Sequence, residues 1–171
     1  MISIEVTDTG VQAALKALAQ RLTNMQPVMQ SIGEDIVSRT KERFNTSTGP
    51  DGQRWAPNAR ATIEAFVNSK GGYGKKGINK KGRDLAIGKK PLIGETGDLR
   101  RQFHVAATSS SVTIGNSAIY AAIQQFGGQA GRGKKVTIPA RPFLPVKSDG
   151  ELYAADRALI MDALNAYLAG Q

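Results

Sequence analysis

The sequence predicts an α+β fold, in which a small antiparallel sheet packs with amphipathic helices from both ends of the chain. Three observations predict it. Apolar residues recur at helical spacing within 9–45 and 149–169, they alternate with polar residues within 99–116, and 69–90 is rich in lysine and glycine, which predicts a long basic loop. The 171 residues contain no internal repeat and fit a single domain, 1–171, with a flexible basic insertion at about 69–90.

The N-terminal third is predicted to hold a strand and two helices. Residues 2–6, "ISIEV", alternate and predict a short strand. Helical spacing then runs from Leu15 to Phe44. Pro27 divides it, because proline is tolerated in the first turn of a helix but not in its interior. The apolar stripe of these helices is interpreted as core, and packing against a neighbouring subunit is the alternative.

Turn-forming residues occupy 45–58, where Trp55 is the one large apolar anchor, and a short helix is predicted at 59–68. The segment 69–90 follows. It has few residues to bury, so it is expected to be mobile when the protein is free.

A hairpin and a short helix are predicted next. Residues 99–107 and 112–116 alternate on either side of a polar turn, and 117–126 has helical character that ends at Gly127. The predicted core residues are Leu99, Phe103, Ile114, Ile119, Phe126 and Leu159.

The C-terminal third is predicted to hold a strand, an extended strip and a helix. The strand is "KKVTI", 134–138, and the strip is "IPARPFLP", 138–145. Phe143 in this strip is expected to pack in the core of its own chain, with docking on a neighbour as the alternative. Ser148 and Glu151 have the spacing of a capping box, which predicts that the last helix begins at 149.

A glycine-rich stretch has the spacing of a phosphate-binding P-loop over seven of its eight positions. Gly128 to Lys134 reads G-x-x-x-x-G-K, but a P-loop continues with a Ser or Thr that ligates magnesium, and here the next residue is Lys135. The prolines that follow also exclude the helix whose N-terminus would receive the phosphate. No nucleotide site is therefore predicted, and Gly127 and Gly128 are interpreted as a sharp turn after a helix.

The chain offers little material for catalysis. It has no cysteine and a single histidine, His104, which is interpreted as an ordinary strand residue. No nucleophile, base and orienting group occur in a recognisable pattern, so an enzyme, a metal site and a bound cofactor are not predicted. The lack of cysteine fits folding in a reducing cytosol. No apolar run reaches the roughly 18 residues of a membrane span, so no membrane partner is predicted.

Most of the net charge of +9 lies in one segment. Residues 69–90 hold eight basic residues against one acidic residue, Asp84. The candidate contacts to a partner or to DNA are Lys70, Lys75, Lys76, Lys80, Lys81, Arg83, Lys89 and Lys90. A nucleic-acid-binding module is the alternative function, because lysines neutralise phosphates. Tyr73 is the one aromatic residue of the segment that could stack on bases.

Four stretches outside 69–90 carry a resemblance that covers nearly the whole chain except that segment. They are "PDGQRW" at 50–55, "LIGETGDLR" at 92–100, "VTIGNSAIYAAIQQFGG" at 112–128 and "IPARPFLP" at 138–145. Their order resembles the phage virion morphogenesis family, the tail completion proteins of Mu-like and related tailed phages. The candidate structural-motif residues are Trp55, Gly97, Tyr120, Phe126, Gly127, Gly128, Pro139, Arg141, Pro142 and Phe143.

The resemblance implies a non-enzymatic virion protein that acts in tail completion and head–tail joining, at the head-proximal end of the tail or in the neck. It also implies homo-oligomeric rings, often of six subunits, and partners among the neck, connector and tail terminator proteins. The expected location is the virion, and the host cytoplasm during assembly. The basic segment is then expected to contact an acidic surface of an adjoining neck protein, with non-specific contact to phage DNA as the alternative.

Overall fold

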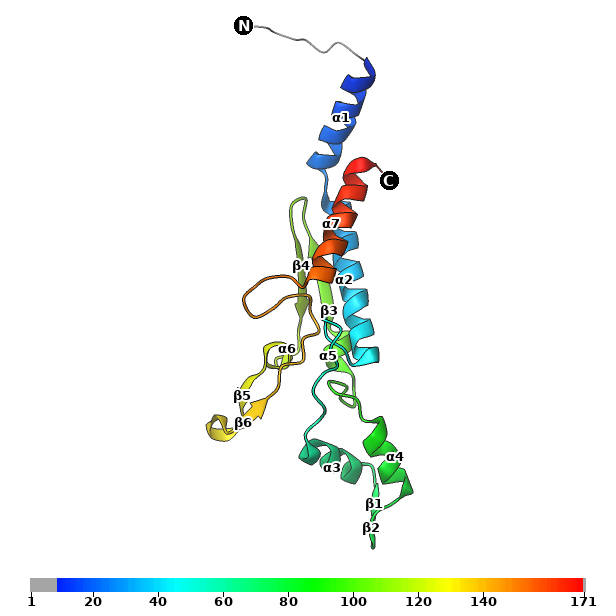
Figure 1. The fold of residues 1–171 in the computed structure, drawn as a ribbon, viewed down its shortest axis with the longest axis vertical. Helices are drawn as coiled ribbons and strands as arrows, with labels where there is room; N and C mark the ends of the chain where they lie inside the picture. The colour runs from blue at the N-terminus through cyan, green and yellow to red at the C-terminus, as the bar shows by residue number, and fades with distance from the viewer. Residues whose placement is uncertain (1–8, 171) are drawn as a thin grey trace.

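The computed structural model describes residues 9–170, and their arrangement is elongated (Figure 1). The helices are α1 (Thr9–Thr23), α2 (Gln26–Thr46), α3 (Arg60–Ser69), α4 (Lys80–Gly88), α5 (Asp98–Arg101), α6 (Ala121–Phe126), the 3₁₀ turn η1 (Arg132–Lys134) and α7 (Ala154–Ala169). The strands are β1 (Tyr73–Gly74), β2 (Gly77–Ile78), β3 (Phe103–Ala107), β4 (Val112–Asn116), β5 (Gly128–Ala130) and β6 (Val136–Ile138). The α+β class is confirmed.

The strands of the described residues form three separate antiparallel hairpins, β1–β2, β3–β4 and β5–β6. The small sheet expected from the sequence is therefore divided into two-stranded ribbons. An isolated ribbon of this kind is marginally stable, and β3–β4 gains support by packing along α2. The strand predicted at 2–6 lies outside the described residues.

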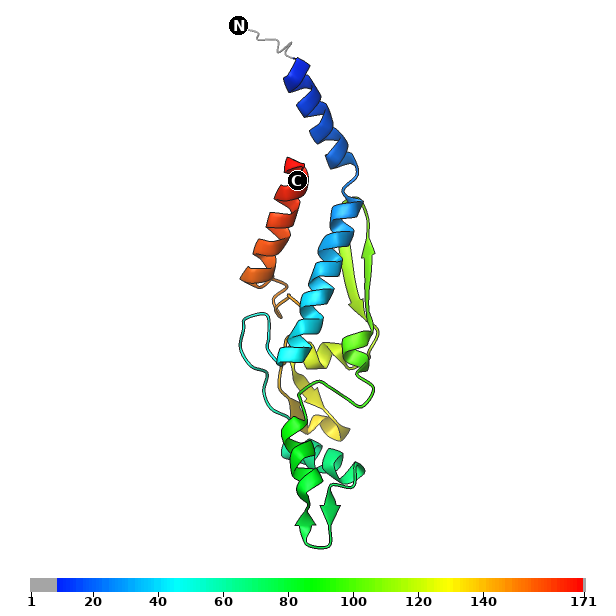
Figure 2. The ribbon, with the colours of Figure 1, turned by 90° about the vertical axis from the view of Figure 1, so that its right-hand side faces the viewer.

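Helix α2 is the central element of the body. The hairpin β3–β4 lies along one side of it and α7 along the other (Figure 2). Pro27 sits in the first turn of α2, which confirms the predicted division of the N-terminal stretch into two helices. The buried face of α2 includes Val28, Ile32 and Ile36.

One apolar cluster joins α2 to both of its neighbours. Ile114 of β4 packs against the buried α2 residues from the hairpin side, and Ile160 and Leu164 of α7 pack against them from the other. In the hairpin, Val105 pairs with Ile114, and the β3 side chains alternate between partly buried and exposed, as the sequence predicted. Leu159 of α7 is only partly buried.

A second cluster lies at the C-terminal end of α2. Phe44, Trp55, Leu99 and Phe143 are buried in it, and Phe103 packs against them. The rings of Phe44 and Trp55 meet edge to face at 5.3 Å between centroids, and Phe143 lies 5.4 Å from Phe44. The prediction that Phe143 packs in the core of its own chain is confirmed.

Helix α1 does not join this core, and in this respect the interpretation of its stripe as core was wrong. It has no buried residue, and its Leu15, Leu18 and Leu22 are 60%, 37% and 54% exposed. The helix extends beyond the body at one end of the molecule (Figure 1). Near its C-terminus it touches α7, where Arg21 donates a 2.8 Å hydrogen bond to the carbonyl of Leu168.

Two of the predicted core residues are also wrong. Ile119 is fully exposed and Phe126 is 47% exposed. The physical reason is that the helix begins at 121 rather than 117. The side chain of Asn116 holds the residues just before the helix in a turn. It donates to the carbonyl of Leu99 and accepts from the N–H of Ala118. The face of α6 that turns inward therefore carries Gln125, which is buried, as described below.

The predicted start of the last helix is wrong as well. Ser148 and Glu151 do not cap a helix. They lie in a turn that is closed by a β-bridge between Val146 and Leu152, and α7 begins only at Ala154. The turn forms in place of the helix start because Asp149 accepts the N–H of Glu151, so that this N–H is not available to a capping box. The helix ends at Gly170, in the left-handed conformation, as predicted.

The basic segment is not the unstructured loop that its composition predicts. It folds into the hairpin β1–β2 and the helix α4, which packs against α3 at the end of the molecule opposite α1 (Figure 1). Asn79 caps α4 by accepting the N–H of Gly82. A side chain at Gly82 would meet the carbonyl oxygen of Gly72 at 2.1 Å, so only glycine permits this close approach. We call residues 60–90 the basic tip.

Candidate partner-binding surfaces

The motif residues of the sequence mainly build a buried polar framework around the strip 138–145. Trp55 donates a 2.8 Å hydrogen bond from its indole nitrogen to the carbonyl of Pro142. Arg141 donates to the carbonyls of Ala56 and Pro57 at 2.8 and 2.7 Å, and burial lowers the pKa of its guanidinium from the usual value. These bonds tie the strip to the 47–58 loop. Their role is therefore structural.

Gln125 completes this framework from α6. Its carbonyl oxygen accepts the backbone N–H groups of Phe143 and Leu144, both at 2.9 Å. Its amide nitrogen donates to the carbonyls of Leu144 and Val146. Among the described residues, no strand pairs with the strip at Phe143 and Leu144, and Gln125 supplies hydrogen-bond partners there.

A buried ion pair connects the same strip to α2 and α7. One guanidinium nitrogen of Arg43 contacts the two carboxylate oxygens of Asp156 at 2.6 and 2.7 Å. The other donates to the carbonyl of Phe143 at 2.9 Å. The side chain of Asp156 is fully buried and that of Arg43 is 10% exposed. Neither residue was singled out in the sequence, because they lie 113 positions apart and each looks like an ordinary charge on a helix.

The other motif residues serve turns or lie at the surface. Gly97 precedes α5 with φ of 68°, and Gly127 ends α6 with φ of 73°. This confirms the sharp turn after the helix. Gly128 begins β5, so the P-loop-like stretch is a β-hairpin with η1 at its tip, and no helix follows it. Tyr120 is 44% exposed, and Pro139 is exposed.

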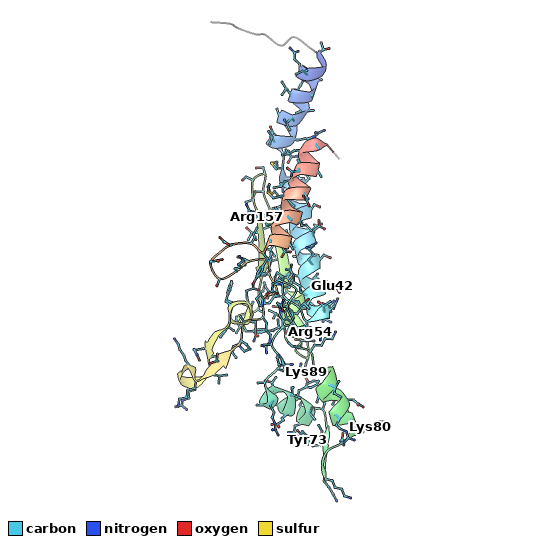
Figure 3. The ribbon with its side chains drawn as sticks, in the orientation of Figure 1. Glu42, Arg54, Tyr73, Lys80, Lys89 and Arg157 are labelled. Carbon is cyan, nitrogen blue, oxygen red and sulfur yellow. The ribbon has the colours of Figure 1, made fainter. Side chains whose placement is uncertain are left out.

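The eight basic residues all lie in the basic tip but do not share one face. Lys75 and Lys76 form the two-residue turn of the β1–β2 hairpin, and Arg83 is exposed on α4. The remaining five line a common pocket; they are Lys70, Lys80, Lys81, Lys89 and Lys90. Figure 3 shows Tyr73, Lys80 and Lys89 at this end of the molecule.

This pocket is an open depression between α3, α4 and the 93–95 loop, with a volume of about 800 Å³. Phe66, Leu85 and Ile93 line it and are partly buried. The sequence analysis missed this apolar floor because the segment was treated as a loop. The signals that predict a helix here were present: Asn79 is a favourable N-cap, and Gly88 lies at the end of the apolar run after it.

Several lysines of the pocket are held by the protein itself. The ammonium group of Lys70 lies 2.7 Å from the carboxylate of Glu95, and this hydrogen bond lowers the pKa of Glu95 from its usual value. Lys89 lies over the ring of Phe66, 4.6 Å from its centroid, and donates to the carbonyl of Ile93.

Lys90 donates to the carbonyl of Asn45, and this bond ties the tip to the end of α2. Within the described part of the chain, Lys80, Lys81 and Asp84 form no ion pair.

The described residues contain no cluster of His, Cys, Asp and Glu that could hold a metal ion. None of their helices is both long enough and apolar enough to cross a membrane. Two exposed surfaces of the described residues have a marked character, the leucine stripe of α1 and the lysine-rimmed pocket of the basic tip.

The chain belongs to the phage virion morphogenesis family, whose model matches residues 6–169. A curated relative is "Mu-like prophage FluMu G protein 2" of Haemophilus influenzae. It is 32% identical over 145 residues, which cover 84% of this chain and 83% of the relative. No solved structure gives a significant match. Family membership assigns this chain a structural role in the phage virion.

Proposed function

We propose that this protein acts in tail completion and head–tail joining, at the neck or the head-proximal end of the tail, and that it does so without catalysis. It is made in the host cytoplasm and incorporated during assembly. The observation that carries the proposal is the placement of two exposed surfaces of different chemistry at opposite ends of an elongated chain (Figure 1). A joining protein must hold two partners at once, and separate surfaces allow this.

The first surface is the leucine stripe of α1, to which we assign assembly into a ring. Leu15, Leu18 and Leu22 are spaced three and four residues apart, which places them on one face of the helix. Contiguous exposed apolar side chains of this kind mark protein–protein contacts. The leucines of one copy would be covered by the stripe or the body of a second copy. When each copy covers the next in the same way and the rotation between neighbours closes, the copies form a ring.

The ring assignment predicts the behaviour of two matched variants. Leu15→Ser/Leu18→Ser removes apolar surface from the stripe and should abolish the oligomer. Lys16→Ser/Gln20→Ser places the same two serines on the polar side of α1 and should leave it intact. Native mass spectrometry at equal protein concentration measures both. A discrete oligomer that survives in the leucine variant would contradict the assignment.

The second surface is the basic tip, to which we assign contact with an adjoining neck, connector or tail terminator protein. Within the tip α4 packs against α3, and Lys90 ties the tip to the end of α2, so the charges are presented on an ordered scaffold. Charged contacts of this kind accelerate association and select partners more than they add affinity.

The experiment for this contact compares two sets of three neutralised charges. Lys75→Gln, Lys76→Gln and Lys81→Gln in the tip should reduce the yield of infectious particles by at least about tenfold, because the charges that accelerate association with the partner are lost. Arg132→Gln, Lys134→Gln and Lys135→Gln at the exposed β5–β6 tip are the control and should leave the yield unchanged. Equal yields from both sets would refute the assignment of the tip to assembly.

The nucleic-acid-binding function remains the second candidate. The eight basic residues of 69–90 favour it, because each neutralised phosphate releases counterions. It predicts that the purified protein binds duplex DNA with an affinity that falls steeply with salt.

A further inference from the structure

The pocket of the basic tip has the composition of a docking site rather than of a solvated charged surface. Its floor is apolar, because Phe66 of α3, Leu85 of α4 and Ile93 of the adjoining loop all line it. Its volume of about 800 Å³ exceeds what one side chain needs and suits a short peptide segment. Apolar side chains in a concave site are the usual anchors of recognition.

The charged side chains around the pocket indicate which charge a bound segment would carry. Five lysines and two acidic residues surround the floor. Lys70 is already compensated by Glu95, and Lys89 is engaged with Phe66 and the carbonyl of Ile93. Lys80 and Lys81, on the first turn of α4, form no ion pair within the described residues, so they are the cations available to a ligand. An occupant with carboxylates would satisfy them.

Duplex DNA does not match this arrangement. Phosphates gain nothing from an apolar floor, and a uniformly charged rod would contact Lys75 and Lys76 at the hairpin turn as readily as the pocket lysines. A ligand that needs both the floor and Lys80 with Lys81 must carry apolar and acidic groups close together.

We propose that this pocket receives an acidic segment of a partner protein, with an apolar side chain inserted between α3 and α4 and its carboxylates on Lys80 and Lys81. The proposal rests on the proposed function in one respect, which is that it places the partner among the proteins that adjoin this chain in the virion. The aliphatic stems of Lys80 and Lys81 would add apolar contact to the bound segment while their ammonium groups meet its carboxylates.

The test uses three fluorescent probes and the full chain. The probes are a short peptide of glutamates flanking two leucines, a polyglutamate peptide of equal length and a short DNA duplex. Fluorescence anisotropy should show that the leucine-containing peptide binds at least about tenfold more tightly than polyglutamate. Lys80→Glu/Lys81→Glu should weaken it by at least about tenfold, while Lys75→Glu/Lys76→Glu, with the same change in charge, should alter it by less than about threefold.

Three results would overturn the proposal. One is equal binding of the two peptides, which means attraction by charge alone. Another is equal loss in the two double variants, and the third is no binding of the leucine peptide at about 1 mM. Preferred binding of the DNA duplex, lost equally in both variants, would instead support the nucleic-acid function. Circular dichroism of each variant establishes that it is folded.

Virion yield separates failure of this proposal from failure of the proposed function. If both double variants reduce the yield equally, the tip acts in assembly but the pocket is not its contact. If the peptide binds as expected but neither variant reduces the yield, the pocket is a binding site and the assignment of the tip to head–tail joining is wrong.

Discussion

Asp156→Ala is expected to lower the free energy of unfolding by about 3–5 kcal/mol, because it leaves the guanidinium of Arg43 buried without its carboxylate. The pair lies where α2, α7 and the strip 138–145 meet, and the same guanidinium holds the carbonyl of Phe143. Urea denaturation at fixed protein concentration measures the change.

Two further variants show whether the cost comes from the unpaired charge. Glu151→Ala removes the partner of Lys147 in an exposed ion pair and should cost no more than about 1 kcal/mol. Arg43→Met/Asp156→Leu replaces both buried charges by apolar side chains and should recover most of the loss. A single Asp156 variant as stable as the wild type would show that the pair contributes nothing to the fold.

Phe143→Ala should have an effect of similar size, about 3–5 kcal/mol, since truncation of a buried phenylalanine removes its transfer free energy and leaves a cavity. Its ring is fully buried between Phe44 and Phe103. Phe126→Ala is the matched control, because that ring is 47% exposed, and it should cost about 1 kcal/mol or less. Equal midpoints of thermal unfolding for the two variants would mean that the second apolar cluster is wrongly placed.

Local sequence patterns were sufficient to predict the helices and strands whose apolar side packs in the core of this chain. The division at Pro27, the alternation in β3 and the burial of Phe143 all follow from local rules that the tertiary structure does not oppose. Helix α1 shows the limit of such rules. Its leucines have the spacing of a core stripe, and periodicity cannot say whether the surface that covers such a stripe belongs to the same chain or to another.

Other sequence predictions were wrong because two local patterns competed in the same stretch of chain. Ser148 and Glu151 have the spacing of a capping box, but the bridge between Val146 and Leu152 fixes a turn there instead. In the basic segment, overall composition concealed the N-cap at Asn79. The buried contacts of Arg43 and Gln125 depend on residues far away in the sequence, so no local pattern indicates them.

We propose that this protein joins heads to tails. This proposal is tested most directly by electron microscopy of lysates from the phage that encodes the protein, with its gene inactivated and the wild-type chain either withheld or supplied in trans. Without the chain, the account predicts filled heads and tails that accumulate as separate particles, and with the chain it predicts complete virions. Complete, joined virions at normal yield in the absence of the chain would contradict it.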